Sequence, residues 1–367
     1  MPELSALQLI IGFLLLLTPV VFFHELGHYL VAKRNGVRIE VFSVGFGPEL
    51  FGWTDKTLTR WKFSIIPLGG YVKMFGEGDH TGGGKSNNPL TDEQKKYSFS
   101  HKTLGQRAAI VVAGPAANFL FAIVVLVALF MSVGQPYTPA EVGSVKSKSA
   151  ADTAGLKMGD RILEINGNKI YRFEDVQQIV RLAAGERLQL LVDRSGQKIR
   201  LYATPESSEL KDRSGNTHKI GMLGISRQGV SYVRHGPGKA VWQALRECVQ
   251  LTLGTFKAIG QMVQGTRSVD ELGGPVRIGQ MSGDFAKSGF IAFLWFMALL
   301  SINLGLINLF PIPMLDGGHL FFYAVEAIIR RPINERIQEY SFRIGMALIL
   351  GFMVFVTLND IKSIFNV

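Results

Sequence analysis

Four long apolar runs divide the chain, from about residue 7 to 30, 108 to 133, 290 to 310 and 342 to 358. Each has about the length that an α-helix needs to cross a hydrocarbon core of roughly 30 Å. Polar segments with shorter patterns lie between them. The pattern predicts a polytopic α-helical membrane protein with four transmembrane helices.

Two segments after the first run have the alternation of β-strands. Residues 38–44 alternate in part, and residues 60–65 alternate cleanly, with Trp61, Phe63 and Ile65 on one face. Gly and Pro in residues 45–48 and 67–70 predict turns. We expect a membrane-associated β-hairpin or small sheet beside the first span.

Residues 137–228 have the character of a soluble domain, with short apolar strands and one helix near residues 173–183. Residues 154–167 show the order of small residue, turn, strand and Asn-Gly turn that is seen in PDZ domains. A later segment is similar to the loop and strand that hold a peptide in such domains. It consists of Gly221, Met222, Leu223, Gly224 and Ile225. Because this loop comes last, the expected PDZ domain is circularly permuted.

The remaining polar segments are less specific. Residues 236–264 form an amphipathic helical pattern, to be placed either on the outer membrane surface or against the PDZ domain. Residues 271–279 are expected to form a structured loop. Residues 82–86 resemble a phosphate-binding loop, but the required upstream glycine is one residue out of place, so a solvated linker is expected.

These patterns define seven segments along the chain. They are a first transmembrane helix (1–34), a cytoplasmic-side sheet and polar loop (35–104), a second transmembrane helix (105–135), a periplasmic PDZ domain (136–228), an amphipathic helix and loop (229–285), a third transmembrane helix (286–321), and a cytoplasmic turn with the fourth transmembrane helix (322–367).

Composition and charge support this picture and set the orientation. The chain is 47% hydrophobic yet 19% charged, which suits spans combined with soluble parts. Between Lys33 and Arg107 there are 12 Lys and Arg against 7 Asp and Glu, so this segment is expected to be cytoplasmic. Both termini and the PDZ domain are then periplasmic. The net charge of +10 reflects this bias rather than nucleic-acid binding.

Two further exclusions follow from the sequence. The only cysteine is Cys248, so neither an intrachain disulfide nor a cysteine metal cluster is expected. No basic segment precedes the first apolar run, so we expect no removable signal peptide.

The first apolar run ends in His24-Glu25-Leu26-Gly27-His28. Two histidines four residues apart lie on one face of a helix and can bind one zinc ion, while the adjacent glutamate can act as general base on a zinc-bound water. Such a motif also occurs by coincidence in soluble chains, but buried polar groups are costly in lipid without partners. We therefore expect a catalytic site near the cytoplasmic face.

The end of the third run supplies the expected third zinc ligand, Asp316, although an Asp in Asp-Gly-Gly is also typical of a plain turn. Asn303, Asn308, Pro311 and Pro313 interrupt this run, and irregular backbone is tolerated there when it lines a cavity. Asn118 in the second run either faces the metal or makes a packing hydrogen bond. His319 is a candidate for contact with a ligand, and the other histidines are expected to be structural or solvated.

Together these motifs resemble the bacterial site-2 intramembrane metalloproteases of family M50, and are most similar to the RseP-type regulator-of-sigma-E proteases. The resemblance covers the whole chain. It implies that His24, His28 and Asp316 bind one Zn²⁺ and that Glu25 is catalytic. It also implies that Asn303, Asn308, Pro311 and Pro313 shape substrate access, and that the hairpin re-enters the membrane. One departure is the single PDZ domain, where related proteins carry two.

The resemblance implies a zinc metalloendopeptidase of the bacterial inner membrane. It would cleave transmembrane segments of single-pass proteins, such as trimmed anti-sigma factors in a stress response, and remnant signal peptides. An unwound substrate is expected to pair with the hairpin near Phe63 and Ile65. The alternative is a membrane PDZ scaffold or quality-control receptor with a non-catalytic metal site. The sequence leaves the native substrate, the activating signal and the oligomeric state open.

Overall fold

The computed structural model describes residues 6–76, 90–211, 217–266, 268 and 273–365. It forms two compact units. The first consists of Met1–Val127, Val241–Lys257 and Val269–Val367, and the second of Ala128–Ala240 and Ala258–Ser268. The segment that resembles a phosphate-binding loop, residues 82–86, lies outside the described residues.

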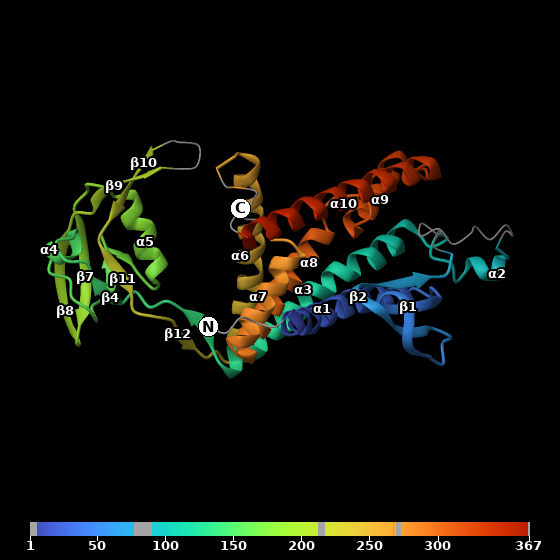
Figure 1. Ribbon diagram of the computed structural model, residues 1–367, viewed down its shortest axis with the longest axis horizontal. Helices are drawn as coiled ribbons and strands as arrows, with labels where there is room; N and C mark the ends of the chain where they lie inside the picture. The colour runs from blue at the N-terminus through green and yellow to red at the C-terminus, as the bar shows by residue number, and fades with distance from the viewer. Residues whose placement is uncertain (1–5, 77–89, 212–216, 267, 269–272, 366–367) are drawn as a thin grey trace. The chain divides into compact units, whose positions relative to one another are not determined.

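The four apolar runs are confirmed as helices (Figure 1). They are α1 (Ala6–Arg34), α3 (Leu104–Ser132), α8 (Phe290–Asn308) and α10 (Glu335–Phe365). By length and composition, all four can cross a membrane. Buried side chains such as Leu16, Val20, Phe296 and Met297 join α1 to α8. The first unit is thus a helical membrane protein.

The third span is interrupted where the sequence predicted. Its helix ends at Asn308, residues 309–315 are irregular, and a new helix, α9 (Asp316–Ile329), begins at Asp316. The segment expected to carry the third transmembrane helix, 286–321, therefore contains the break that its prolines indicated, followed by the start of a second helix. Pro311 and Pro313 have no N–H to donate, which ends the helical hydrogen bonding. Asp316 consequently begins a helix instead of ending a span.

The expected loop at 271–279 is also wrong from residue 275 onward. Helix α7 (Pro275–Lys287) begins there, with proline in its first turn, and packs against α1 and α8. The buried carboxylate of Asp360 in α10 accepts hydrogen bonds from Gly274 N at 3.0 Å and Arg277 N at 2.9 Å. This satisfies donors that the first turn of a helix leaves unpaired.

The predicted sheet after the first span is confirmed, and it is larger than expected. It consists of β1 (Ile39–Thr54) and β2 (Arg60–Met74), whose register pairs residues 41–44 with both 60–63 and 70–73. Residues 41–44 and 51–54 lie on opposite sides of residues 60–63 and run in opposite directions, so the chain reverses between them. The turn expected at 45–48 is therefore confirmed, and Gly45 and Gly47 have φ of 92° and 88° there. A short helix, α2 (Asp92–Lys95), precedes α3.

The second unit combines short strands with one longer helix, α5 (Phe173–Leu182), close to the predicted bounds. A four-stranded sheet has the order β6-β5-β7-β8. Its strands are β5 (Arg161–Ile165), β6 (Asn168–Lys169), β7 (Leu188–Arg194) and β8 (Gln197–Ala203). The Asn-Gly turn lies at Asn166 and Gly167, both with positive φ.

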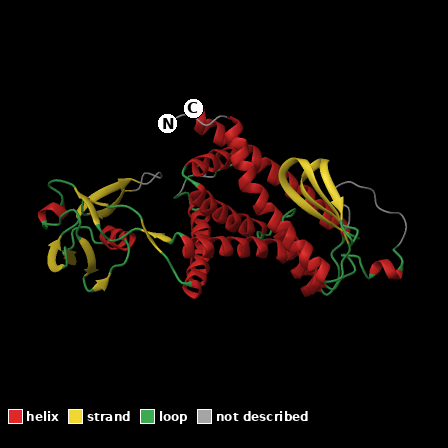
Figure 2. Ribbon diagram, turned by 90° about the horizontal axis from the view of Figure 1, so that it is seen from below, coloured by secondary structure: helices red, strands yellow, loops and turns green. Residues whose placement is uncertain are grey.

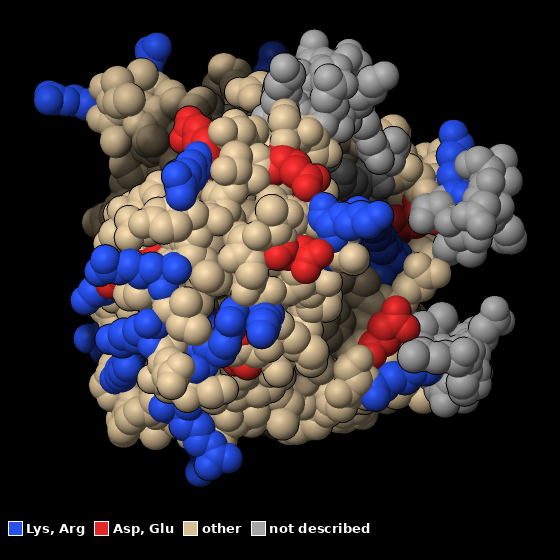
Figure 3. Space-filling model, turned by 90° about the vertical axis from the view of Figure 1, so that its left-hand side faces the viewer, with Lys and Arg blue, Asp and Glu red and all other residues tan. Residues whose placement is uncertain are grey.

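Three further strand pairs and a short helix complete this unit (Figure 2). They are β3 (Gln135–Tyr137) with β12 (Ser231–Val233), β4 (Val142–Val145) with β11 (Ile225–Arg227), and β9 (Glu206–Lys211) with β10 (Thr217–Met222), together with α4 (Ala150–Thr153). Its core contains Val142, Ile162, Ile165, Leu188 and Leu190. Charged side chains of both signs are spread over the face seen in Figure 3, as is usual for a surface in water.

The amphipathic segment forms α6 (Pro237–Val263), whose residues 241–257 belong to the first unit. Thr255 Oγ1 donates to Asn303 Oδ1 at 3.1 Å, and the rings of Phe256 and Phe310 lie 6.0 Å apart. The sequence did not predict these contacts with α8 and the segment that follows it.

Candidate metal centre

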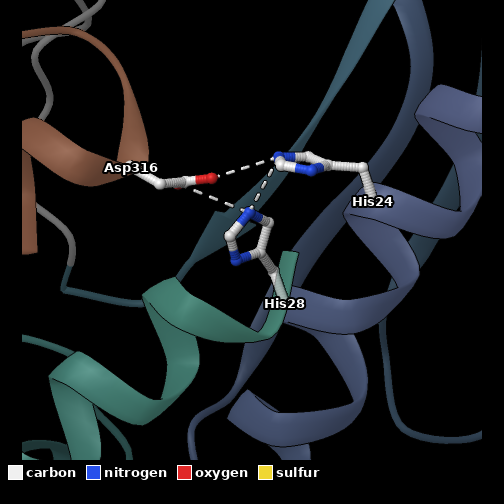
Figure 4. A group of neighbouring side chains, drawn as sticks. All are labelled: His24, His28 and Asp316. Carbon is white, nitrogen blue, oxygen red and sulfur yellow. Dashed lines mark hydrogen bonds and ion pairs between the residues drawn. The ribbon is translucent and has the colours of Figure 1, made fainter. Parts of the chain in front are cut away.

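His24 and His28 project from the same face of α1, one helical turn apart (Figure 4). Both side chains are buried, and their Nε2 atoms are 3.2 Å apart. The apolar run around them allows α1 to be buried, and the spacing of four places the imidazoles together. The predicted pair is therefore correctly placed for binding one metal ion.

Asp316 reaches the same point from the first residue of α9 (Figure 4). Its Oδ2 is 3.2 Å from His24 Nε2, and its Oδ1 is 3.5 Å from His28 Nε2. Gly317 and Gly318 let α9 begin directly against the carbonyls of residues 309–312, where a Cβ would collide. The tight start of α9 fixes where the carboxylate points.

The three distances between ligand atoms fit zinc. Zinc binds nitrogen and carboxylate oxygen at about 2.0–2.2 Å in tetrahedral geometry, which places neighbouring ligand atoms about 3.4 Å apart. The observed separations are 3.2, 3.2 and 3.5 Å. Asp316 Oδ2 is also buried without a hydrogen-bond donor among the described residues, as expected of an oxygen that accepts from a metal. His24, His28 and Asp316 can therefore hold one zinc ion with a fourth position open.

Two glycines allow α3 to pass directly beside this group. A Cβ on Gly114 would collide with Nε2 of His28, and a Cβ on Gly27 would collide with the carbonyl oxygen of Ala113. The sequence predicted close helix approach at residues 114–118, and the structure confirms it. The backbone of α3 thus forms one wall of the candidate site.

The other ring nitrogens of both histidines have partners on α3. His28 Nδ1 lies 2.9 Å from the carbonyl oxygen of Ile110, which can only accept, so Nδ1 carries the proton and Nε2 is free for metal. His24 Nδ1 is 3.1 Å from Nδ2 of the buried Asn118. Of the two alternatives for Asn118, the structure supports the one that faces the metal site.

The orientation of the Asn118 side-chain amide follows from the hydrogen-bond partners of its two polar atoms. Its Oδ1 is buried and has no hydrogen-bond partner among the described residues. Exchanging the oxygen and nitrogen positions, which have nearly the same shape, lets Oδ1 accept from a protonated Nδ1 of His24. That arrangement satisfies the buried oxygen and frees His24 Nε2 for the metal. The amide is itself held through its main chain, because Ser301 Oγ donates to Asn118 O at 2.9 Å.

Glu25 is buried beside His24, and its Cγ faces Gly70 of β2. A Cβ on Gly70 would be 3.0 Å from this Cγ. Within the described part of the chain, the Glu25 carboxylate has no hydrogen bond or ion pair. An unengaged carboxylate next to two metal-binding imidazoles has the position expected of a general base.

The four residues predicted to shape substrate access make different contacts. Asn303 binds α6 through Thr255, Asn308 is the last residue of α8, and Pro313 packs against Gly345 of α10. Pro311 is exposed. His319 contacts the ring of Phe342 at 5.0 Å and is not part of the metal-binding group.

Phe63 and Ile65 do not form an open edge of the sheet, contrary to the prediction. Phe63 pairs with Val44 on one side and Phe51 on the other, so it lies in the interior of the sheet and not at an edge. An edge near Phe63 and Ile65 is therefore not available to a substrate. Residues 70–73, beside Glu25, have a strand partner on one side only among the described residues.

A hydrogen-bond network fixes the sheet to α1 one residue beyond His28. Asp55, in the turn between β1 and β2, accepts from Trp61 Nε1 at 3.1 Å and Tyr29 Oη at 3.3 Å. Backbone N–H groups of Thr57 and Thr59 donate to its other oxygen. Burial raises the pKa of the Asp55 carboxyl, but these hydrogen bonds outweigh burial and hold it below its usual range.

Residues 221–225, the predicted peptide loop of the second unit, are divided between β10, β11 and the two residues that join them. Gly221 and Met222 end β10, Ile225 begins β11, and Gly221 is packed against the carbonyl oxygen of Val180 in α5. Leu223 is a core residue, and its carbonyl accepts from Ala151 N at 2.9 Å, while Lys146 N donates to Gly224 O at 2.8 Å.

Comparison with known proteins decides the family. The family model described as peptidase family M50 matches residues 12–352. The chain belongs to peptidase family M50. It is 45% identical over 361 residues to "Putative zinc metalloprotease Atu1380" of Agrobacterium fabrum, covering 97% of this chain and 96% of the relative. It is 36% identical over 382 residues to "Metalloprotease MmpA" of Caulobacter vibrioides, covering 97% and 96%.

As a member of family M50, this chain is a zinc metalloprotease. Its cofactor is Zn²⁺, which the ligand atoms of His24, His28 and Asp316 fit. Among solved structures, the chain is similar to the PDZ domain of the SdrC-like protein from Listeria monocytogenes. That similarity has a TM-score of 0.20 at 21% identity and covers 25% of this chain and 88% of the other.

Proposed function

We propose that this M50 protease is an intramembrane endopeptidase that cleaves the transmembrane segments of single-pass membrane proteins. The observation that carries the proposal is the position of the metal-binding group. His24 and His28 belong to a helix long and apolar enough to span a membrane, and Asp316 follows directly after another such helix. A site built into the spans acts on peptide bonds that lie within or beside the bilayer.

Each residue has a distinct role in this mechanism. His24 and His28 would hold zinc through Nε2, and Asp316 would hold it through its carboxylate. Zinc, when bound, polarises the substrate carbonyl and acidifies the attacking water. The Glu25 carboxylate takes the proton of that water and delivers it to the leaving amine nitrogen. Ile110 and Asn118 keep the protons of the two imidazoles on Nδ1.

The substrate must be extended at the cleaved bond, because a helix hides its carbonyl groups from attack. We propose that it pairs with the edge of the sheet at residues 70–73, which lies beside Glu25. A disulfide cross-link tests this in a Cys248→Ala background. Tyr71→Cys should cross-link to a cysteine placed near the scissile bond of the substrate. Thr54→Cys, at the opposite edge of the sheet, should not.

Localisation and biological role belong to the same proposal. The excess of Lys and Arg between residues 33 and 107 supports an inner-membrane protein with its site near the cytoplasmic face and its second unit in the periplasm. There, a PDZ domain would exclude substrates with bulky outer domains, and the substrates would include trimmed anti-sigma factors and remnant signal peptides.

The central test is cleavage of a reporter with one transmembrane segment by purified protein in lipid vesicles. Wild type should cleave the reporter, and Glu25→Gln should reduce the rate by at least about 100-fold, the lower end of general-base effects. Glu25→Gln should retain zinc, since the glutamate is not a ligand. Undiminished cleavage by this variant would refute the mechanism. Zinc bound without any cleavage of the reporter panel would favour the scaffold alternative.

A further inference from the structure

A groove of about 760 Å³ lies between α9 and the start of α10, apart from the metal-binding group. The two helices are labelled together in Figure 1. One wall is the apolar face of α9, with Phe321, Phe322, Val325 and Ile329. The opposite wall contains Ile333 and Ile337. The groove therefore offers an apolar channel to a flexible hydrocarbon chain.

The lining of the groove includes one cationic residue, and two more lie close to it in the chain. Arg331 lines the groove, Arg330 precedes Arg331, and Arg336 follows in the first turn of α10. Among the residues that the structure describes, none of these three arginines makes an ion pair. The nearest buried carboxylate, Glu326, is already engaged by Arg107 at 2.8 Å and by Ile333 N at 3.3 Å. The positive charge of these exposed arginines is thus available to an outside anion.

The groove also lies next to the start of a candidate membrane span. The candidate span of α10 begins at Arg336, next to the groove, and runs to Lys362. An exposed apolar side chain that does not line the groove, Ile328 at 80% exposure, also belongs to α9. An apolar channel with arginines at the level of the lipid headgroups matches the two parts of a phospholipid.

We propose that this groove binds a phospholipid with an anionic headgroup. An acyl chain lies along Phe321, Val325 and Ile329, and Arg331 binds the phosphate, for which a planar guanidinium is well suited. Because α9 begins at Asp316, a lipid held against its far end braces the helix that carries a metal ligand. This site is independent of the proposed cleavage reaction.

Lipid retention by the purified full-length protein tests the proposal. Wild type is placed in bilayer discs that contain phosphatidylglycerol and phosphatidylcholine in equal amounts, and co-purifying lipid is counted by native mass spectrometry. Wild type should retain phosphatidylglycerol in preference. Arg331→Gln should lower its occupancy by about fivefold, as expected for one cation near a membrane surface. Arg331→Lys should retain most of it.

Two further variants separate loss of the site from loss of folding. Ile329→Trp fills the channel from α9 and should also lower retention. Arg343→Gln removes an exposed arginine that pairs with Glu339 on α10, and should leave retention unchanged. Zinc content should be equal in all variants. Equal retention of both lipids by wild type, or unchanged retention in Arg331→Gln and Ile329→Trp, would overturn the proposal, as would displacement of the lipid by the peptide substrate.

Discussion

At the scale of single residues, Asn118 determines which nitrogen of His24 carries the proton. Replacing it with leucine leaves Nδ1 without its buried partner, so the tautomer that presents Nε2 to zinc is no longer favoured. Outer partners of metal-binding histidines typically contribute 10- to 100-fold to affinity. We expect Asn118→Leu to weaken zinc binding by about that factor, measured by competition with a chromophoric chelator. Asn303→Leu, which alters a contact with α6 instead, should bind zinc like wild type.

Gly114 gives a second prediction at this scale. The Cβ of Gly114→Ala would lie 2.2 Å from His28 Nε2, and the clash involves a ring fixed at Nδ1 by Ile110. We expect loss of stoichiometric zinc and of cleavage, while Gly105→Ala, where a Cβ meets nothing within 4 Å, should retain both. A Gly114→Ala protein with full zinc content would show that α1 and α3 are further apart than described.

The metal-binding residues were predictable because their signals are local. The spacing of His24 and His28 specifies one helix face, and a carboxylate among helix-breaking prolines stands out in an apolar run. The role of the Ile110 carbonyl could not be predicted, because every residue carries such a group and only tertiary packing selects one. The ion pair between Arg107 and Glu326 joins residues 219 positions apart, and neither has a distinctive sequence context.

At the scale of elements, strand alternation predicted that a sheet follows the first span but not which row is open. The alternation of Trp61, Phe63 and Ile65 shows which side chains share a face. Which segment forms the edge of the sheet depends instead on how β1 and β2 fold back on each other. Pairing of residues 41–44 with two segments places Phe63 inside. Likewise, Pro311 and Pro313 indicated a broken helix, but the new helix at Asp316 depends on Gly317 and Gly318 packing against a carbonyl-lined turn.

The sheet of the second unit contains a buried ion pair whose contribution depends on pH. Asp160 is fully buried between β4 and β5 and accepts two hydrogen bonds from Arg194, both at 2.7 Å. Burial raises the pKa of the Asp160 carboxyl, but the bonds from Arg194 and from Lys157 N outweigh burial, so the pKa lies below its ordinary value. A carboxylate with a lowered folded-state pKa stabilises the fold above its unfolded value of about 3.9, and this stabilisation is lost as pH falls below it.

Asp160→Asn should therefore destabilise the second unit by about 3 kcal/mol at pH 7, because it leaves Arg194 without its counter-ion. The difference from wild type should shrink below about pH 4, where the wild-type carboxyl also becomes protonated. Hydrogen exchange of the β5 and β7 amides in the full-length protein measures this. Glu186→Gln, at an exposed position, serves as the control. A difference that stayed constant with pH would mean that lost packing, not lost charge, causes the effect.

At the scale of the whole molecule, zinc connects only elements of the first unit. His24 and His28 belong to α1 and Asp316 to α9, while the core of the second unit is a separate cluster that includes Val142, Ile162 and Leu188. A ligand that binds only the folded state stabilises it by about 4 kcal/mol at a thousand times its dissociation constant. Chelation should withdraw that stabilisation from the first unit alone.

We expect removal of zinc to accelerate hydrogen exchange in α1, α3 and α9 and to leave β5, β7 and β8 unchanged. Exchange is read by mass spectrometry on the full-length protein in detergent, with and without chelator, and readdition of zinc should restore protection. Asp316→Asn should resemble the chelated wild type and should not respond to chelator, because the site has lost one of its three ligands. Equal loss of protection in both units would show that they unfold together. Unchanged exchange in α9 of a zinc-depleted sample would show that Asp316 is not a zinc ligand.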